Sequence, residues 1–306
     1  MGKYVAKRFV SMVITLFLVA TVTFFLMHAV PGQPFEISRE TPESVKEALY
    51  AKYGLDRPLS EQYVIYMKNL LHGDFGVSMK YKSQTVLGKV TSGMPVSAVI
   101  GFGGVLAGCL IGACFGILAA LKNKGITDYL VIILAILGVS IPNFVFGSLI
   151  QRYFAVEWKL FPIQGWKGAE YVILPVMAAA FTNVAYYARM LRTSMLDVMG
   201  QDYIYTAKSK GLNQNEIVGK HILRNSFLPL VTSLGPMCAG ALTGNFVIEK
   251  IFNVPGIGQS MISSIQNSDY TMIMGLTIIF AFISVICYFL VDIIYGIVDP
   301  RIRIAG

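Results

Sequence analysis

Six long runs without a charged side chain dominate this sequence and restrict it to a narrow set of folds. Each run has 18 to 26 residues, and a helix needs about 20 residues to cross the hydrocarbon core of a bilayer. Backbone polar groups in hydrocarbon must find partners within the chain, and the period-2 alternation of a membrane barrel is absent. We therefore predict an all-α polytopic membrane protein with six transmembrane helices, at Phe9–Val30, Val96–Leu121, Tyr129–Gln151, Tyr171–Ala188, Asn225–Ile248 and Tyr270–Val291.

The composition agrees with this fold class. Of the 306 residues, 55% are hydrophobic and only 14% are charged, which is far more apolar than a soluble domain. The net charge of +8 does not indicate nucleic-acid binding, because Lys and Arg are spread over many loops and no basic, aromatic-rich strand motif occurs. The four cysteines all lie in apolar runs, and we interpret them as small packing residues: Cys109, Cys114, Cys238 and Cys287.

The distribution of basic residues predicts the orientation of the chain. With the N-terminus in the cytoplasm, 13 of the 25 Lys and Arg lie inside, eight lie in the long first outer loop and four lie in the other outer loops. The positive-inside rule counts mainly short loops, so both termini are predicted to be cytoplasmic. The first run starts like a signal peptide, but it is long and no small-x-small cleavage site follows, so we interpret it as a retained helix.

Three regions follow from these runs. Residues 1–30 hold the N-terminus and the first helix, residues 31–95 form an external domain, and residues 96–306 hold the other five helices. The last region includes a polar cytoplasmic loop at 189–224.

The external domain is too long for a bare loop, so we expect it to be helical. The sequence Thr41-Pro42-Glu43 predicts a helix start, with the helix continuing towards Tyr53. Ser60 is expected to cap a second helix, with Gly73 after its end. This domain either covers the helix bundle or offers a docking surface to an external partner, and the two roles are compatible.

Glycine recurs at every fourth position of the second run, which places the glycines on one helix face. Such a stripe lets a neighbouring backbone approach closely, as in small-xxx-small packing. The neighbour is either another helix of this chain, which we favour, or a helix of a second membrane subunit. The residues are Gly104, Gly108, Gly112 and Gly116.

Prolines interrupt three of the runs, at Pro142, Pro175, Pro229 and Pro236. Proline removes a backbone donor and kinks a helix, which occurs in transport pathways and in inert bundles alike. Asp292, near the inner end of the last run, is an ionisable residue in a membrane segment and hence a functional candidate. We favour the plainer interpretation that it lies near the headgroups and pairs with a Tyr or Arg.

The sequence contains none of the common catalytic or nucleotide-binding motifs. There is no phosphate-binding loop, no His-Glu-x-x-His helix and no Gly-x-Ser-x-Gly elbow. The three histidines, His28, His72 and His221, are far apart. We therefore expect no enzymatic activity, no cofactor and no metal site in this chain.

The polar segment between the fourth and fifth runs is the best candidate for a mechanism. Asp202 is expected to cap a short helix from Tyr203 to Lys210, and Gly211 to end it in a left-handed conformation. Asn213 and Glu216 resemble a capping box that starts a further helix. Two helices joined by a glycine corner and leading into a membrane run would transmit a force. The alternative is a basic loop that only sets topology.

Residues 206–212, Thr-Ala-Lys-Ser-Lys-Gly-Leu, resemble the EAA loop of ABC-importer permeases in its peptide and nickel variant. The Glu of that motif is Tyr205 here, and its first Ala is Thr206. Further matches span the chain, at 30–34, 53–58, 73–78, 221–225, 249–258 and 299–303. The chain is thus similar to the B-type membrane subunits of oligopeptide permeases.

The resemblance implies a translocation subunit of an ATP-driven oligopeptide importer in a bacterial inner membrane. Implied partners are a second permease subunit, two ATPase subunits that bind ATP and Mg²⁺, and an extracellular peptide-binding protein. The contact with the ATPase is implied for Tyr205, Thr206, Ala207, Lys208, Gly211 and Leu212. Alternatives are another cargo of the family, such as a dipeptide or a nickel chelate, and an ATP-independent transporter or channel. The latter class is expected to show an inverted repeat, paired intramembrane charges or a filter sequence, and the sequence has none.

Overall fold

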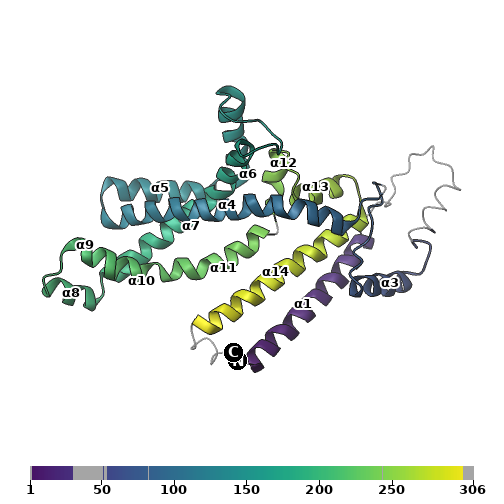
Figure 1. Ribbon diagram of the computed structural model, residues 1–306, viewed down its shortest axis with the longest axis horizontal. Coiled ribbons are helices and arrows are strands. Elements are labelled where there is room, and N and C mark those ends of the chain that lie inside the picture. Colours follow the sequence, from purple (N-terminus) through teal and green to yellow (C-terminus); the bar gives the residue numbers. More distant parts are fainter. Residues whose placement is uncertain (1, 30–50, 52–53, 82, 243, 299–306) are drawn as a thin grey trace.

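The protein is built from helices. The computed structural model (Figure 1) describes residues 2–29, 51, 54–81, 83–242 and 244–298. Within these ranges the only β pairing is an isolated bridge between Val77 and Thr85. The predicted all-α class is therefore confirmed for the described part of the chain.

Among the described residues, four helices are long and apolar enough to cross a membrane. A fifth possible span is a broken pair, in which α5 (Ile126–Ser140) is followed by α6 (Asn143–Ile150) and the π-helical segment η1 (Gln151–Glu157). The two halves are bent by 102°, so the run predicted as one helix over Tyr129–Gln151 is broken, at the proline that was named as an interruption. Pro142 is the N-cap of α6, and the break occurs there because proline excludes the preceding residue from helical geometry. The four long helices are α1 (Gly2–Ala29), α4 (Val86–Leu121), α7 (Glu170–Met199) and α14 (Tyr270–Val298).

The predicted fifth run is also divided. It contains α11 (Leu228–Leu242) and the start of α12 (Phe246–Ile251), with Gly244 between them at φ +88°. Each piece falls short of a full span, so length and composition give four spans in the described part of the chain, or five with the bent pair, where six were predicted. In contrast, α4 starts at Val86, well before the apolar run that begins at Val96. Its first turns therefore belong to the region assigned above to the external domain.

Helices α4 and α7 lie side by side and form the centre of the fold (Figure 1). Helices α5 and α11 pack on this pair, and α14 joins α11 to α1. Helix α1 contacts α14 and leaves most of its surface uncovered. Four apolar clusters of the described residues fill the interfaces, and the one at the α8 end, which contains Tyr187, Leu191 and Met195, bears on the site below. Pro175 and Pro236 are accommodated inside α7 and α11.

The region between α1 and α4 contains α3 (Leu59–Leu71). Its N-cap is Pro58, so the predicted capping by Ser60 is wrong: Ser60 lies in the first turn of the helix. Gly73 follows the helix at φ +75°, as predicted. Tyr63 of α3 packs its ring against Phe24 of α1 at 5.4 Å between centroids, which fixes α3 to the end of α1.

Two predictions fall outside this description. The helix expected from Thr41 to Tyr53 lies outside the described residues apart from position 51. Asp292 belongs to α14, but its side chain lies outside the described part of the protein.

Candidate functional site

The polar segment after α7 forms a short helix, α8 (Asp202–Ser209). Gln201 is its N-cap, without a side-chain hydrogen bond, so the predicted capping role of Asp202 is wrong. Asp202 occupies the first turn instead, where its negative charge is favourable at the positive end of the helix dipole. The helix ends as predicted at a left-handed glycine, since Gly211 has φ +77°.

A second helical stretch follows this corner. Asn213 accepts a hydrogen bond from the Glu216 N–H at 2.9 Å, which is one half of the predicted capping box. The Glu216 carboxylate does not complete the box; it accepts from Lys220 Nζ at 3.1 Å, and this contact lowers the pKa of Glu216. From there the chain stays helical up to Phe227 and then enters α11. The segments are α9 (Gln214–Glu216), η2 (Ile217–Leu223) and α10 (Arg224–Ser226).

The two helical stretches are held together by apolar side chains. On α8, Ile204 and Ala207 are buried, at 0% and 5% exposure. They belong to the same cluster as Ile217 and Ile222 of η2 and as Met195 of α7. We call the unit from α8 to α10, residues 202–226, the corner unit. Its buried face makes it an extension of the end of α7 and not a free loop.

Polar contacts add to this anchoring. Asn225 Nδ2 donates to the Tyr203 hydroxyl oxygen at 3.0 Å, which joins α8 to α10. The Ser194 hydroxyl donates to the Ser226 carbonyl oxygen at 3.0 Å, which joins α7 to α10. The corner unit is therefore tied to α7 at both of its ends.

The opposite face of α8 is open. Tyr205 is 57% exposed, and Lys208 Nζ lies over its ring, 5.6 Å from the centroid. Thr206 is also exposed, and its hydroxyl donates to the Asp202 carbonyl oxygen at 3.0 Å. The corner unit thus presents an aromatic ring, a cation and a hydroxyl on a helix whose back is fixed.

The six residues implied in the ATPase contact therefore divide into two groups. Tyr205, Thr206, Lys208 and Gly211 are exposed. Ala207 is buried and Leu212 is partly buried against the same cluster, so these two hold the unit in place. Figure 1 shows α8 and α9 at one end of the molecule, where α7 ends and α11 begins.

The structure places the glycine stripe of α4 against α7. A Cβ atom on Gly104 would lie 2.7 Å from the Ala179 Cβ, and one on Gly112 would lie 2.7 Å from the Val184 carbonyl oxygen. Gly108 and Gly116 likewise face α7 backbone and side-chain atoms. The stripe therefore faces a helix of this chain, which is the alternative favoured above.

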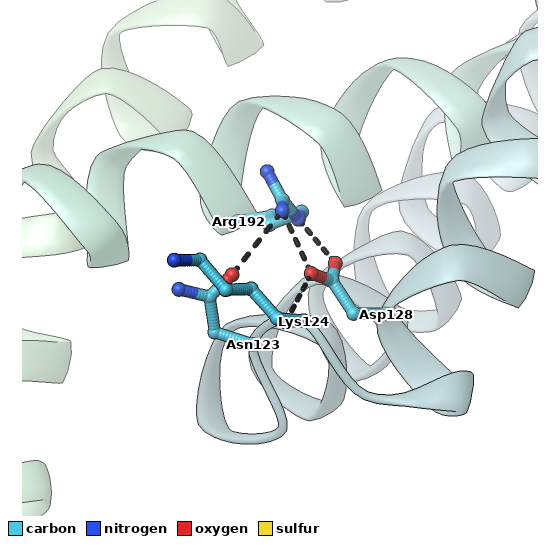
Figure 2. Close-up of polar contacts among 4 residues, drawn as sticks. All are labelled: Asn123, Lys124, Asp128 and Arg192. Atoms are coloured by element: carbon cyan, nitrogen blue, oxygen red, sulfur yellow. Dashed lines mark hydrogen bonds and ion pairs between the residues drawn. The ribbon is translucent and has the colours of Figure 1, made fainter.

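An ion pair between a buried carboxylate and a half-buried arginine lies at the same end of α7. Arg192 of α7 binds both carboxylate oxygens of Asp128, through Nε and through Nη2, the latter at 2.8 Å (Figure 2). Sequence reasoning missed this pair, because Asp128 immediately precedes the third apolar run and Arg192 was counted only as a cytoplasmic charge. A carboxylate in the first turn of a membrane helix was the available signal, but the sequence does not name its partner.

A second buried carboxylate lies at the other end of α4. Glu249 of α12 is fully buried and accepts from the backbone N–H groups of Asn245 at 3.1 Å and Gln259 at 3.0 Å. Ser97 of α4 accepts from the Ile257 N–H at 2.9 Å, at the start of α13 (Ile257–Gln266). These bonds fix the connection between α12 and α13 on α4. Glu249 and Ile257 belong to the stretch 249–258 that carries part of the sequence resemblance.

Comparison with known proteins relates the whole chain to transport proteins. Residues 112–304 match the family described as binding-protein-dependent transport system inner membrane component, and residues 1–100 match the N-terminal part of such components. The chain is similar to the dipeptide transport system permease protein DppB of Bacillus subtilis, with 44% identity over 99% of both chains. It is also similar to the oligopeptide transport system permease protein OppB of Haemophilus influenzae and of Escherichia coli K12, with 40% and 38% identity over 99% of this chain and 100% of each relative.

Proposed function

This chain belongs to the inner membrane components of binding-protein-dependent transport systems, and we propose that it is the translocation subunit of an ATP-driven peptide importer. The observation that carries the proposal is the corner unit, which is fixed to α7 on one face and exposed on the other. A separate ATPase subunit that binds the exposed face of α8 moves α7 and α11 with it. The chain itself hydrolyses nothing, and ATP and Mg²⁺ belong to the partner subunits.

Rigidity of the corner unit is the physical requirement for this role. A movement of the ATPase reaches the membrane helices only if α8, the contact helix, does not move independently of α7. Buried Ile204 and Ala207, together with the bonds of Tyr203 and Ser194, couple α8 to α7 and α10. The left-handed Gly211 sets the angle between the two helical stretches at little steric cost.

A peptide cargo follows from the relatives, whose names divide between dipeptide and oligopeptide transport. We propose oligopeptides as the cargo, following the motif resemblance, with dipeptides as the alternative; relatives of both kinds align over nearly their full length. Choice among peptides is assigned to the external binding protein. Uptake of labelled dipeptides and pentapeptides by the assembled complex, each with its binding protein, distinguishes the two cargoes.

We further propose that the chain crosses the membrane six times, with both termini in the cytoplasm. In this arrangement α5 and α11 are the two short crossings. Each has 15 residues, which is about 22 Å of helix against a hydrocarbon core of about 30 Å. At α11 the helical segments that precede it extend the crossing, whereas the segment after α5 is bent by 102° and does not lengthen the crossing of α5. The partners are a second permease subunit, two ATPase subunits and an extracellular binding protein.

The test changes the corner and leaves the exposed side chains of α8 unaltered. A left-handed conformation costs a non-glycine residue roughly 1–2 kcal/mol, and a β-branched residue resists it most. Gly211→Val is therefore expected to leave the chain in the membrane but to abolish most ATP-dependent peptide uptake. Gly219→Val is the matched control, because Gly219 lies in η2 with open space around it.

The measurement is peptide uptake per assembled complex in proteoliposomes. Equal uptake by the Gly211 variant and the control, at equal assembly, contradicts the coupling role. Detergent extraction is expected to bring down the ATPase subunits with the chain. Peptide transport by the purified chain without any ATPase favours the secondary-transporter alternative.

A further inference from the structure

The ion pair between Asp128 of α5 and Arg192 of α7 uses both oxygens of the carboxylate. The Asp128 side chain is only 2% exposed, and both of its oxygens are used. Arg192 binds them in a two-point contact, and the Lys124 N–H donates to Oδ2 at 2.9 Å (Figure 2). Arg192 also lies 3.5 Å from Asn123 Oδ1, in the turn that joins α4 to α5.

Stability alone is a poor explanation for such a pair. The cost of removing two charges from water is often as large as their attraction, and apolar residues of similar volume commonly hold a core equally well. What a two-point Arg–carboxylate contact adds is a fixed relative position and orientation of the two groups. The pair therefore sets geometry that an apolar contact leaves adjustable.

The position of the pair shows what it connects. Asp128 lies in the first turn of α5, which leads to the break at Pro142 and to the bent segment beyond. Arg192 lies one helical turn before Met195, whose fully buried side chain belongs to the cluster that anchors Ile204 of α8. The pair thus joins the start of α5 to the part of α7 that carries the corner unit.

We propose that Asp128 and Arg192 are positioning residues that make α5 move with α7 when the corner unit is displaced. This inference rests on the proposed function, because it says how a movement of the corner unit, caused by an ATPase partner, is passed on to α5. Without the pair, α7 still follows the corner unit, but α5 and the bent segment after it lag behind. ATP is then hydrolysed with less peptide moved.

The experiment uses the full complex and separates geometry from stability. Asp128→Asn leaves the half-buried Arg192 without its counter-charge, so it disturbs folding as well as geometry. The double variant Asp128→Leu/Arg192→Met replaces the pair by an apolar contact and is expected to restore folding. Glu157→Gln is the matched control, since it removes the exposed ion pair between Glu157 and Arg152 on η1.

The readout is the number of peptides transported per ATP hydrolysed, together with the midpoint of unfolding in detergent. The double variant is expected to keep the unfolding midpoint while the transport ratio falls about two- to thirtyfold, the range found for residues along a coupling path. The Glu157 variant is expected to match the unaltered chain in both. A double variant with an unaltered ratio overturns the inference, because the pair then serves stability alone.

Two further outcomes are decisive. If the unaltered complex transports no peptide with ATP, both the proposed function and the inference fail. If the double variant keeps the ratio of peptides transported to ATP hydrolysed, only the inference fails. If the double variant does not assemble, the distance between α5 and α7 is measured instead in a complex that keeps Asp128 and Arg192. Spin labels are placed at the exposed positions Tyr129 and Arg189, in a background without the four cysteines. Their separation is expected to stay the same with and without ATP, and a change in it overturns the inference.

Discussion

Helices α1 and α4 are both strongly apolar, yet the protein uses them differently. In the most apolar window of α4, 44% of the residues are buried within the chain, and in that of α1 only 11% are. Helix α4 packs along α7 and also touches α5, α11, α13 and α14, whereas α1 packs mainly on α14, with α3 at one end. Hydropathy thus tells which segments enter the membrane, but it does not tell which of them form the centre.

The difference between the two helices lies in their small residues. The stripe of glycines on α4 removes side chains from the face that meets α7, so the two backbones approach closely. Helix α1 has large side chains around its whole circumference, and its only glycine is Gly2. In lipid, where apolar burial gives little drive for association, such close packing decides which helices pair.

The largest expected effect comes from filling the stripe. A side chain at Gly112 meets the Val184 carbonyl oxygen at 2.7 Å and the Tyr187 Cβ at 2.8 Å. Gly112→Leu is therefore expected to lower the free energy of unfolding by about 3 kcal/mol, as overpacked cores do. Gly240→Ala on α11 is the control, because nothing lies within 4 Å of a Cβ there. Unfolding in mixed detergent checks both, and equal midpoints refute the packing role of the stripe.

An intermediate effect is expected where α4 holds the connection between α12 and α13. Ser97→Ala leaves the Ile257 N–H without its acceptor in a fully buried position. A buried donor without a partner costs about 1–3 kcal/mol. The loss is measured by the same unfolding assay, and hydrogen exchange at Ile257 is expected to rise. Unchanged exchange there means that another acceptor has taken over.

The smallest effect is expected on α1. Leu18 is 52% exposed, so Leu18→Ala is expected to change the free energy of unfolding of the isolated chain by about 0.5 kcal/mol or less. The informative comparison is with the assembled complex. If a second permease subunit covers this face, the variant weakens assembly while the isolated chain is unaffected. A large loss in the isolated chain would show that α1 is packed more tightly than its exposure indicates.

Local chemistry was enough to predict several features of this protein. The uncharged runs predicted helices, because backbone N–H and C=O groups in hydrocarbon find hydrogen-bond partners only within the chain. The corner at Gly211 was predictable since glycine alone adopts a left-handed conformation without strain. Pro142 signalled an interruption, although its result, a bend of 102° that leaves α5 with 15 residues, was not foreseen. Asp202 and Ser60 were predicted as N-caps, but their helices start one and two residues earlier than that, at Asp202 and at Leu59.

The sequence by itself determined the helical membrane class, the polar corner and the glycine face of α4, since each depends on residues within a few turns of one another. Tertiary structure decided that this face meets α7, that Arg192 binds Asp128, and that Ser97 holds the start of α13. Such partners lie tens to more than a hundred residues apart. The sequence shows which polar groups require a partner. Only the folded backbone decides which donor meets which acceptor, because residues that are far apart in the sequence can be close in space.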